Sequence, residues 1–348
     1  MEIKAFSEIN LDDPFFDSLK DGYSEFVDWF ERKVVENAIA YVQYDPNNNI
    51  AGFLYLKIET GTLDDIEPSR PNKKRLKVGT FKVNPHGTRF GERFVKKIMD
   101  KAIVENVDEV YVTVFDEHDA LIGLLGRYGF INGGTKTTAN GTEQVLIKEM
   151  RILFDNVLLD YPLIQSNNRR KFALSIYPEY HTKLFPDSIL RNESYNLIED
   201  ISHTNSIHKI YICFMRDINL LRLGDIIAIY RTKDNLGSAH YRSVITSVCV
   251  VEEVKTKNDF ANVNEFIEYA NAYSIFERDD LIKWFNQQRN LTVIKMTYNI
   301  ALNRRITKQI LMDELGINPE YWGFFRLTDE QFNQLLDRGE VYENIIIN

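Results

Sequence analysis

The stretch Arg75–Ala102, RLKVGTFKVNPHGTRFGERFVKKIMDKA, decides the fold of the N-terminal half of the chain. Residues 75–83 alternate between polar and apolar side chains, which predicts a β-strand. From about residue 88 to residue 106 apolar side chains recur at helical spacing, which predicts a helix. Gly87 and Gly91 lie where this helix begins, and the free amide groups of a helix start favour a bound phosphate. The unit therefore predicts an anion site, although two such glycines are also common as simple helix-entry geometry.

The segments around this unit complete an α/β domain over residues 1–150. A short strand, an amphipathic helix from about Asp13 to Val35, and a hairpin around the turn Asp45–Asn49 precede it. Residues 60–74 are polar and contain two prolines, which predicts a loop. A strand over Glu109–Phe115, a short helix over Asp119–Tyr128 and two further strands follow.

This domain resembles the GNAT acetyltransferase family. The family's acetyl-CoA signature has its register on residues 86–91, HGTRFG, and the segments EVYVTVF (109–115) and HDALIGLLGRYGF (118–130) resemble its fifth strand and fourth helix. His86 stands where the family has Arg or Gln, and Arg89 where it has Gly, so Arg89 is expected to offer its guanidinium to the pyrophosphate. The resemblance implies acetyl-CoA as cofactor, held by Phe81, Lys82, Val83, Gly87, Thr88, Arg89, Phe90, Gly91 and Glu92. The alternative is a degenerate cofactor loop on a retained fold.

The resemblance also implies direct acyl transfer to an amine, assisted by a base and an acid. The family's acid is often a Tyr four residues before the Gly of the Gly-Phe pair, and that position here is Leu125, which cannot donate a proton. His118 and Tyr128 are the remaining, weak candidates for catalytic residues. For Tyr128, core packing is the favoured explanation. No carboxylate lies on residues 75–83, so the sequence names no general base.

The C-terminal half is predicted to form a second domain over residues 171–345, after a connecting segment at 151–170. Strands are expected near residues 172–177, 209–214, 225–230 and 241–254, the last long enough to wrap around a small barrel. The stretches ALSIYPEYHTKLF (173–185) and LGDIIAIYRTKD (223–234) resemble the PUA-like superfamily, which includes ASCH and EVE domains. The resemblance implies a β-barrel with helical decoration. The ASCH signature Gly-x-Lys-x-x-Glu-x-Arg does not follow Leu184, so no hydrolase activity is carried over.

PUA-like domains mostly bind RNA or modified bases, and the resemblance therefore implies a nucleic-acid partner. A basic cluster beside aromatic residues pairs phosphate contacts with base stacking. The candidate residues are Arg169, Arg170, Lys171, Tyr177, Tyr180 and His181. The alternative for the same residues is a charged linker beside barrel aromatics.

The composition limits the remaining possibilities. With 348 residues and 44% hydrophobic side chains the chain is long and apolar enough for about two folded domains. A formal net charge of −9 argues against non-specific coating of nucleic acid. Two cysteines, Cys213 and Cys249, exclude a disulfide framework, and six scattered histidines show no metal spacing. No segment approaches the ~20 apolar residues of a membrane span, and no signal peptide is seen, so we expect a soluble cytoplasmic protein.

Three functions stay open on the sequence. The first is an acetyl-CoA-dependent N-acyltransferase whose PUA-like domain presents a nucleic acid, such as a tRNA, to the active site. The second is a catalytically impaired binding protein of the same fold, acting as a regulator or as a protein partner in a toxin-antitoxin or phage-defence system, which Leu125 favours. The third is an acetyltransferase acting on a protein or a small amine.

Overall fold

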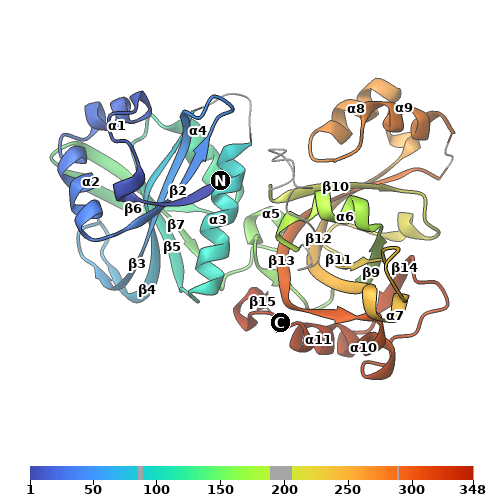
Figure 1. The fold of residues 1–348 in the computed structure, drawn as a ribbon. Helices are drawn as coiled ribbons and strands as arrows, with labels where there is room; N and C mark the ends of the chain where they lie inside the picture. Colours follow the sequence, from blue (N-terminus) through green and yellow to red (C-terminus); the bar gives the residue numbers. More distant parts are fainter. Residues whose placement is uncertain (85–88, 189–205, 288–289, 348) are drawn as a thin grey trace. The chain divides into compact units, whose positions relative to one another are not determined.

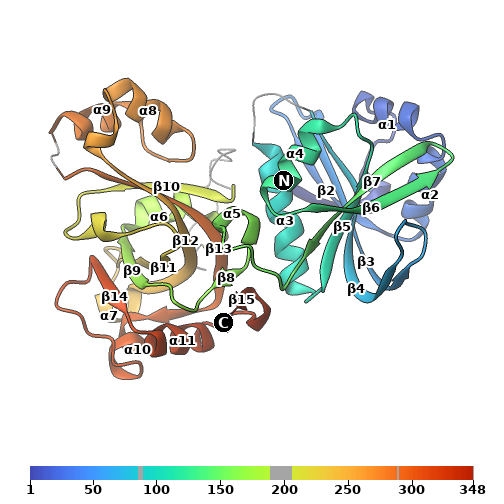
Figure 2. The same cartoon turned by 180° about the vertical axis from the view of Figure 1, so that it is seen from behind.

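The computed structural model describes residues 1–84, 89–188, 206–287 and 290–347. The chain forms two compact units, Met1–Ile152 and Leu153–Asn348. Figures 1 and 2 show the helices and strands of each unit from opposite sides. None of the helices in the described ranges is long and apolar enough to cross a membrane.

The first unit is built on a seven-stranded sheet. All neighbouring strands are antiparallel except β4 and β5, which are parallel. In spatial order the strands are β1 (Glu2–Ala5), β2 (Ile39–Tyr44), β3 (Ile50–Leu63), β4 (Arg70–Val83), β5 (Glu109–Val114), β7 (Gly141–Glu149) and β6 (Ile131–Thr138).

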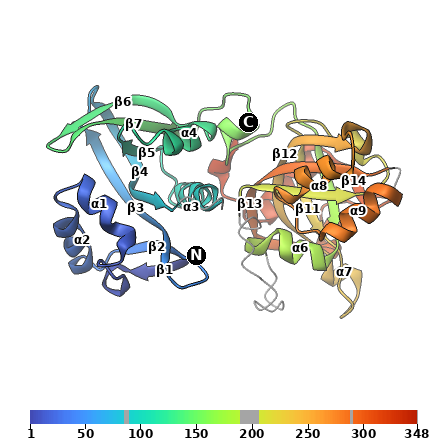
Figure 3. The ribbon, with the colours of Figure 1, turned by 90° about the horizontal axis from the view of Figure 1, so that it is seen from above.

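Helices cover both faces of this sheet, as Figures 1 and 3 show. They are α1 (Asp17–Gly22), α2 (Phe26–Val35), α3 (Phe90–Val104) and α4 (Asp119–Arg127). The single helix predicted from Asp13 to Val35 is interrupted, because Pro14 starts a 3-10 turn and Tyr23 takes an extended backbone conformation after α1. An aromatic core lies under α1 and α2; its members include Phe6, Phe16, Phe26, Phe30 and Phe53.

The two central strands separate part of the way along. β4 pairs with β5 only from Arg75 to Val78, although β4 continues to Val83 and stays paired with β3. The register against β3 shifts at Gly79, which is an extra residue opposite Tyr55 and Leu56 and therefore a β-bulge. A Cβ at Gly79 would lie 2.7 Å from the Tyr55 ring, so the bulge needs a glycine. Bulges bend a strand, and β4 turns away from β5 at this point.

Below the point of separation, an ionic cluster joins β4, β5 and β7. Glu109, fully buried at the start of β5, accepts hydrogen bonds from Arg75, Arg70 and Lys73. Arg70 and Lys73 also reach Glu149, each at 2.8 Å. The predicted loop over residues 60–74 is therefore wrong. β3 and β4 extend through most of it as a long hairpin, and these ion pairs bind its β4 arm to the sheet.

The second unit contains a six-stranded sheet with helices on both faces. The order is β10 (His208–Cys213), β13 (Thr292–Thr307), β12 (Val244–Thr256), β11 (Ile226–Arg231), β9 (Lys171–Ile176) and β14 (Phe324–Leu327). Apolar residues of α8 (Val263–Asn271) and α9 (Arg278–Gln287) join one core, and those of α10 (Lys308–Asp313) and α11 (Asp329–Arg338) join the other. The short helices are α5 (Val157–Asp160), α6 (Pro178–Leu184) and α7 (Ala239–Arg242).

The α/β fold class is confirmed, but the predicted closed barrel is not found in the described part of the chain. β10 and β14 are the two ends of the sheet and do not pair with each other. The long strand that suggested a barrel is β12. It is paired with the 16-residue β13, and three register shifts between them curve the sheet without closing it.

Residues 153–170, expected to be part of a connecting segment, lie in the second unit. Tyr161 and Ile164 are fully buried, and the Asn299 side chain donates a 3.0 Å hydrogen bond to the carbonyl oxygen of Pro162. β8 (Ile164–Gln165) pairs in parallel with β15 (Ile346–Ile347), so this segment and the chain end form a small second sheet.

Candidate functional site

A cavity of about 430 Å³ lies where β4 and β5 separate. Residues 77–81 of β4 and 112–114 of β5 line its two walls, and His118 and Leu121 contribute from the start of α4. Tyr23 and Trp29 line it from the region of α1 and α2. Glu59 on β3 and Glu143 on β7 also line it. The cavity therefore connects a free strand edge with a pocket of charged and aromatic side chains.

The free edge belongs to residues 79–83 of β4. No strand in the described ranges pairs with the side of these residues that faces β5. α3 begins seven residues after the end of β4, at Phe90, and Arg89 is its N-cap residue. An extended chain with amide groups can pair with the free edge, and an anion can bind where the helix begins. Both features match the arm and the phosphates expected of a CoA molecule.

The residues predicted to bind the cofactor lie in different environments, and only some of them line the cavity. Phe81 lines the cavity and packs its ring 5.5 Å from that of Phe94 on α3. The Lys82 ammonium instead binds the Phe15 carbonyl oxygen and the Ser18 hydroxyl. Val83 ends β4, and Phe90 begins α3.

The remaining cofactor residues lie at the helix start. Gly87 and Thr88 lie outside the described residues. Arg89 is the N-cap residue of α3, and Glu92 lies buried in the first turn. A Cβ at Gly91 would lie 2.8 Å from a Leu124 methyl group, so this glycine also allows α3 and α4 to pack closely.

The structure separates the two catalytic candidates. His118 is exposed and lines the cavity just before α4. Tyr128 is 1% exposed, lies in the core and does not line the cavity. Leu125 is also fully buried. Of the two, only His118 is placed to meet a molecule in the cavity.

Sequence reasoning missed a tyrosine–carboxylate pair in the cavity. The Tyr23 hydroxyl, between α1 and α2, donates a 3.1 Å hydrogen bond to Glu143 on β7. Burial and the neighbouring Glu143 carboxylate raise the pKa of Tyr23, so the phenol stays protonated. The two residues are 120 positions apart, and no spacing signal connects them.

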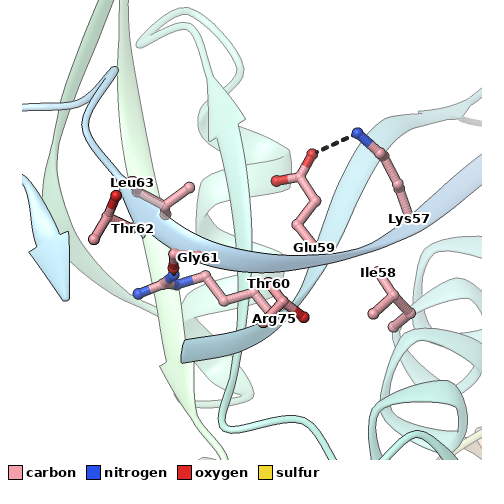
Figure 4. A pocket seen from close by; sticks show the side chains of 8 residues that line it. All are labelled: Lys57, Ile58, Glu59, Thr60, Gly61, Thr62, Leu63 and Arg75. Atoms are coloured by element: carbon pink, nitrogen blue, oxygen red, sulfur yellow. Dashed lines mark hydrogen bonds and ion pairs between the residues drawn. The ribbon is translucent and has the colours of Figure 1, made fainter. Parts of the chain in front are cut away.

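A second such pair contains Glu59, which also lines the cavity. The Tyr111 hydroxyl of β5 donates a 2.5 Å hydrogen bond to Glu59 on β3, and Lys57 forms a 3.0 Å ion pair with the same carboxylate (Figure 4). Burial alone would raise the pKa of Glu59, but these two hydrogen bonds lower it below its usual value. Glu59 therefore remains a carboxylate at neutral pH. It also lines a second cavity of about 380 Å³ along β3.

In the second unit, each predicted basic residue is held by a carboxylate. Arg169 pairs with Asp155, and Arg170 forms two hydrogen bonds of 2.9 and 2.5 Å with Asp225. Lys171, almost fully buried, binds Asp329 at 2.7 Å. Their charges are therefore largely compensated within the unit.

The predicted aromatic residues lie at the other end of β9. Tyr177 is 63% exposed, and Tyr180 packs its ring 5.2 Å from that of Phe276. His181 is completely buried, and a 2.8 Å hydrogen bond joins its Nε2 and the Thr246 hydroxyl. Burial and nearby Arg231 and Arg305 lower the pKa of His181 to about 3. The structure does not bring these residues and the three cations into one exposed surface.

Comparisons with known proteins find solved structures that are similar to parts of this chain. No protein-family model and no curated protein sequence matches the chain. Similar solved structures include ASCH from Zymomonas mobilis, with 13% identity over 49% of this chain and 96% of that chain and a TM-score of 0.34. Chaetomium thermophilum Naa20 in complex with a bisubstrate analogue is similar over 43% of this chain and 86% of that chain, with 14% identity and a TM-score of 0.32. A putative phosphinothricin N-acetyltransferase covers 42% of this chain and 97% of its own, with 13% identity and a TM-score of 0.32. GNAT and ASCH proteins, the two groups that the sequence resembles, are thus both present among the similar structures.

Proposed function

We propose that the first unit is an N-acyltransferase that moves an acyl group from acetyl-CoA to an amine. The observation that carries this proposal is the free edge of residues 79–83, which opens directly into a cavity lined by charged and aromatic side chains. A thioester arm extended along this edge would bring its acyl group to Gly79, where β4 and β5 separate. The acceptor amine would then reach it from the side of Tyr23 and Glu59.

The side chains in the cavity suit this reaction. The acyl-CoA supplies the thioester; the amine nitrogen bonds to the carbonyl carbon, the C–S bond breaks, the amine loses a proton and the thiolate gains one. Glu59 and Glu143 are carboxylates that attract and orient a cationic amine. Tyr23 stays protonated and is the candidate proton donor, and His118 is of the residue type that exchanges protons most readily near neutral pH.

A binding protein without turnover is the second candidate function. The buried Leu125 favours it, because the position that supplies the acid in the resembled family holds a hydrocarbon side chain here. This candidate predicts acetyl-CoA binding without acylation of any amine.

Calorimetry with acetyl-CoA and a thiol-release assay with primary amines test these functions. The substitution Thr113→Trp places an indole in the cavity and should abolish binding, whereas Thr138→Trp, at an exposed position of β6, is the matched control. Absence of acetyl-CoA binding by the unmodified protein rules out both functions. Binding without thiol release leaves the second one.

The nucleic-acid acceptor remains a prediction for the second unit, and the paired state of Arg169, Arg170 and Lys171 does not add to it. Among acceptors, a small amine is favoured by the volume of the cavity, which is in the range of small-molecule sites.

A further inference from the structure

Lys77 is an unusual residue in the wall of the cavity. It lies on β4 one residue before the last β4–β5 pair, it is partly buried, and its ammonium lies 5.6 Å from the centre of the Tyr111 ring. Within the described residues it has no ion pair and no side-chain hydrogen bond. Burial lowers the pKa of Lys77, while Glu59 acts on its charge from beyond ion-pair distance. A partly buried cation without an ion-pair partner carries a desolvation cost that an anion would relieve.

The neighbouring cations differ from Lys77, because they already have partners or are in water. Lys57 is paired with Glu59, and Lys33 is paired with Glu36 at 2.6 Å. Arg32 also lines the cavity, but it is exposed, where solvent and salt screen its charge. Lys77 is therefore the cation in this wall whose charge is available to a bound molecule.

The rest of the pocket describes the remainder of that molecule. Trp29 and Tyr55 pack edge to face, with ring centres 5.6 Å apart, and form an apolar wall. Glu143, whose carboxylate accepts a hydrogen bond from the Tyr23 hydroxyl, provides negative charge for a cationic amine. One side of the pocket thus suits an ammonium group, one an apolar body and one an anion.

The number of available charges selects the type of anion. A carboxylate carries a single negative charge, which one ammonium can match. A phosphate monoester carries about −1.5 to −2 at neutral pH and three strong acceptor oxygens, for which one partly buried cation is too few.

We propose that the acceptor is a small primary amine that carries a carboxylate, such as an amino acid, and that Lys77 binds this carboxylate. The proposal rests on the proposed acyl transfer and names the substrate class of the same cavity. Lys77 sets acceptor preference and takes no part in the bond changes.

Matched pairs of acceptors test this directly. Phenylalanine, leucine, histidine and lysine are each compared with the amine of the same side chain that lacks the carboxylate: phenethylamine, isoamylamine, histamine and cadaverine. Thiol release from acetyl-CoA and product mass are measured for each. At least one amino acid should exceed its amine partner by about 10- to 100-fold in kcat/KM, the range of a hydrogen bond between charged groups.

Variants then assign the preference to Lys77. Lys77→Met should raise KM for the preferred amino acid, so that its advantage over its amine partner in kcat/KM is lost, and Lys77→Arg should keep part of the preference. Lys97→Met, at a partly exposed position of α3 that does not line the cavity, is the matched control and should change neither value. Acetyl-CoA affinity is measured by calorimetry for each variant, and thermal unfolding verifies that each is folded.

The outcomes separate this inference from the proposed function. Failure to bind acetyl-CoA overturns the proposed function itself. Acylation of the amines at rates equal to those of the amino acids, or a carboxylate preference that survives Lys77→Met, overturns the role of Lys77 and leaves acyl transfer in place. Binding of acetyl-CoA without acylation of any of the amino acids overturns the proposed acceptor class.

Discussion

Replacing Glu109 by glutamine should strongly destabilise the first unit. Glu109 is fully buried and accepts hydrogen bonds from three cations, one of which, Arg75, is itself 1% exposed. Arg75 would keep its hydrogen bonds to the carbonyl oxygens of Gly61 and Pro71, both at 2.6 Å, but lose its counter-charge. Removing one partner of a buried ion pair costs about 3–5 kcal/mol. We therefore expect Glu109→Gln to lower the free energy of unfolding by that amount at pH 7.

The same cluster contains a matched control. Glu149 pairs with Arg70 and Lys73 but is 25% exposed, so Glu149→Gln should cost about 0–1 kcal/mol. Global unfolding of a chain with two units does not report on the first unit alone. The stability of the first unit is therefore measured in the full-length protein, from hydrogen exchange of peptides from β4 and β5 at increasing denaturant concentration. Equal losses for the two variants would refute the view that Glu109 is the centre of the cluster.

The pH dependence gives a second test of the same cluster. Burial alone would raise the pKa of Glu109, but the hydrogen bonds from Arg70, Arg75 and Lys73 outweigh it and lower the pKa to about 2. A lowered pKa in the folded state contributes stability above the unfolded pKa, and that contribution is lost as the pH falls toward the folded value. The stability difference between the unmodified protein and Glu109→Gln should therefore be constant above pH 5 and shrink between about pH 4.5 and 2. A difference that is independent of pH would contradict the proposed charge state.

Four further results are expected. Lys77→Met should raise the melting temperature slightly, because burial lowers the pKa of Lys77 and its charge costs stability at neutral pH; an unchanged or lower value in thermal unfolding would contradict this. Acetyl-CoA should slow amide exchange in residues 79–83 and leave β12 unaffected, and uniform exchange would place the arm elsewhere. Leu125→Tyr should overpack the core by about 1–3 kcal/mol in chemical denaturation without increasing thiol release, whereas a gain in rate would show that this position reaches the cavity. Arg170→Glu should destabilise the second unit through loss of the Asp225 pair; weaker, salt-sensitive RNA mobility shifts without loss of stability would instead support a nucleic-acid surface.

The sequence predicted well those parts of the fold that depend on local pattern. The alternation in residues 75–83 and the helical spacing after it correspond to β4 and α3, and Gly129 lies just after α4 as expected of a helix stop. The hydrophobic pattern gave a wrong prediction where ion pairs, instead of apolar contacts, hold a strand in the sheet. Residues 70–74 are polar and were expected in a loop, but Arg70 and Lys73 are bound by carboxylates from β5 and β7, which hold them in a strand.

The candidate site was less accessible to prediction than the fold. A free edge on β4 is expected from the resemblance to the GNAT family. The two tyrosine–carboxylate pairs, in contrast, join distant parts of the chain. Tyr111 and Glu59 are 52 positions apart, on strands separated by β4. Only the three-dimensional order of the strands brings them together. Likewise, the basic run at residues 169–171 had the composition of a nucleic-acid patch, and its carboxylate partners could not be identified from local sequence.

The short β4–β5 pairing has a mechanical consequence for the first unit. The β4–β5 ladder contains four residue pairs, Arg75–Val78 with Glu109–Val112, and an isolated bridge between Glu67 and Thr135 adds one further backbone link between the half-sheet β1–β4 and the half-sheet β5–β7. The Glu109 cluster reinforces the paired end of this short ladder, whereas at the open end the Tyr23–Glu143 hydrogen bond connects side chains and no backbone pairs of β4 and β5 form. A molecule that pairs with the open edge of β4 would act as a removable strand and lengthen the connection between the two halves. The width of the opening, and with it the resistance of the two halves to twisting apart, would then depend on the concentration of that molecule.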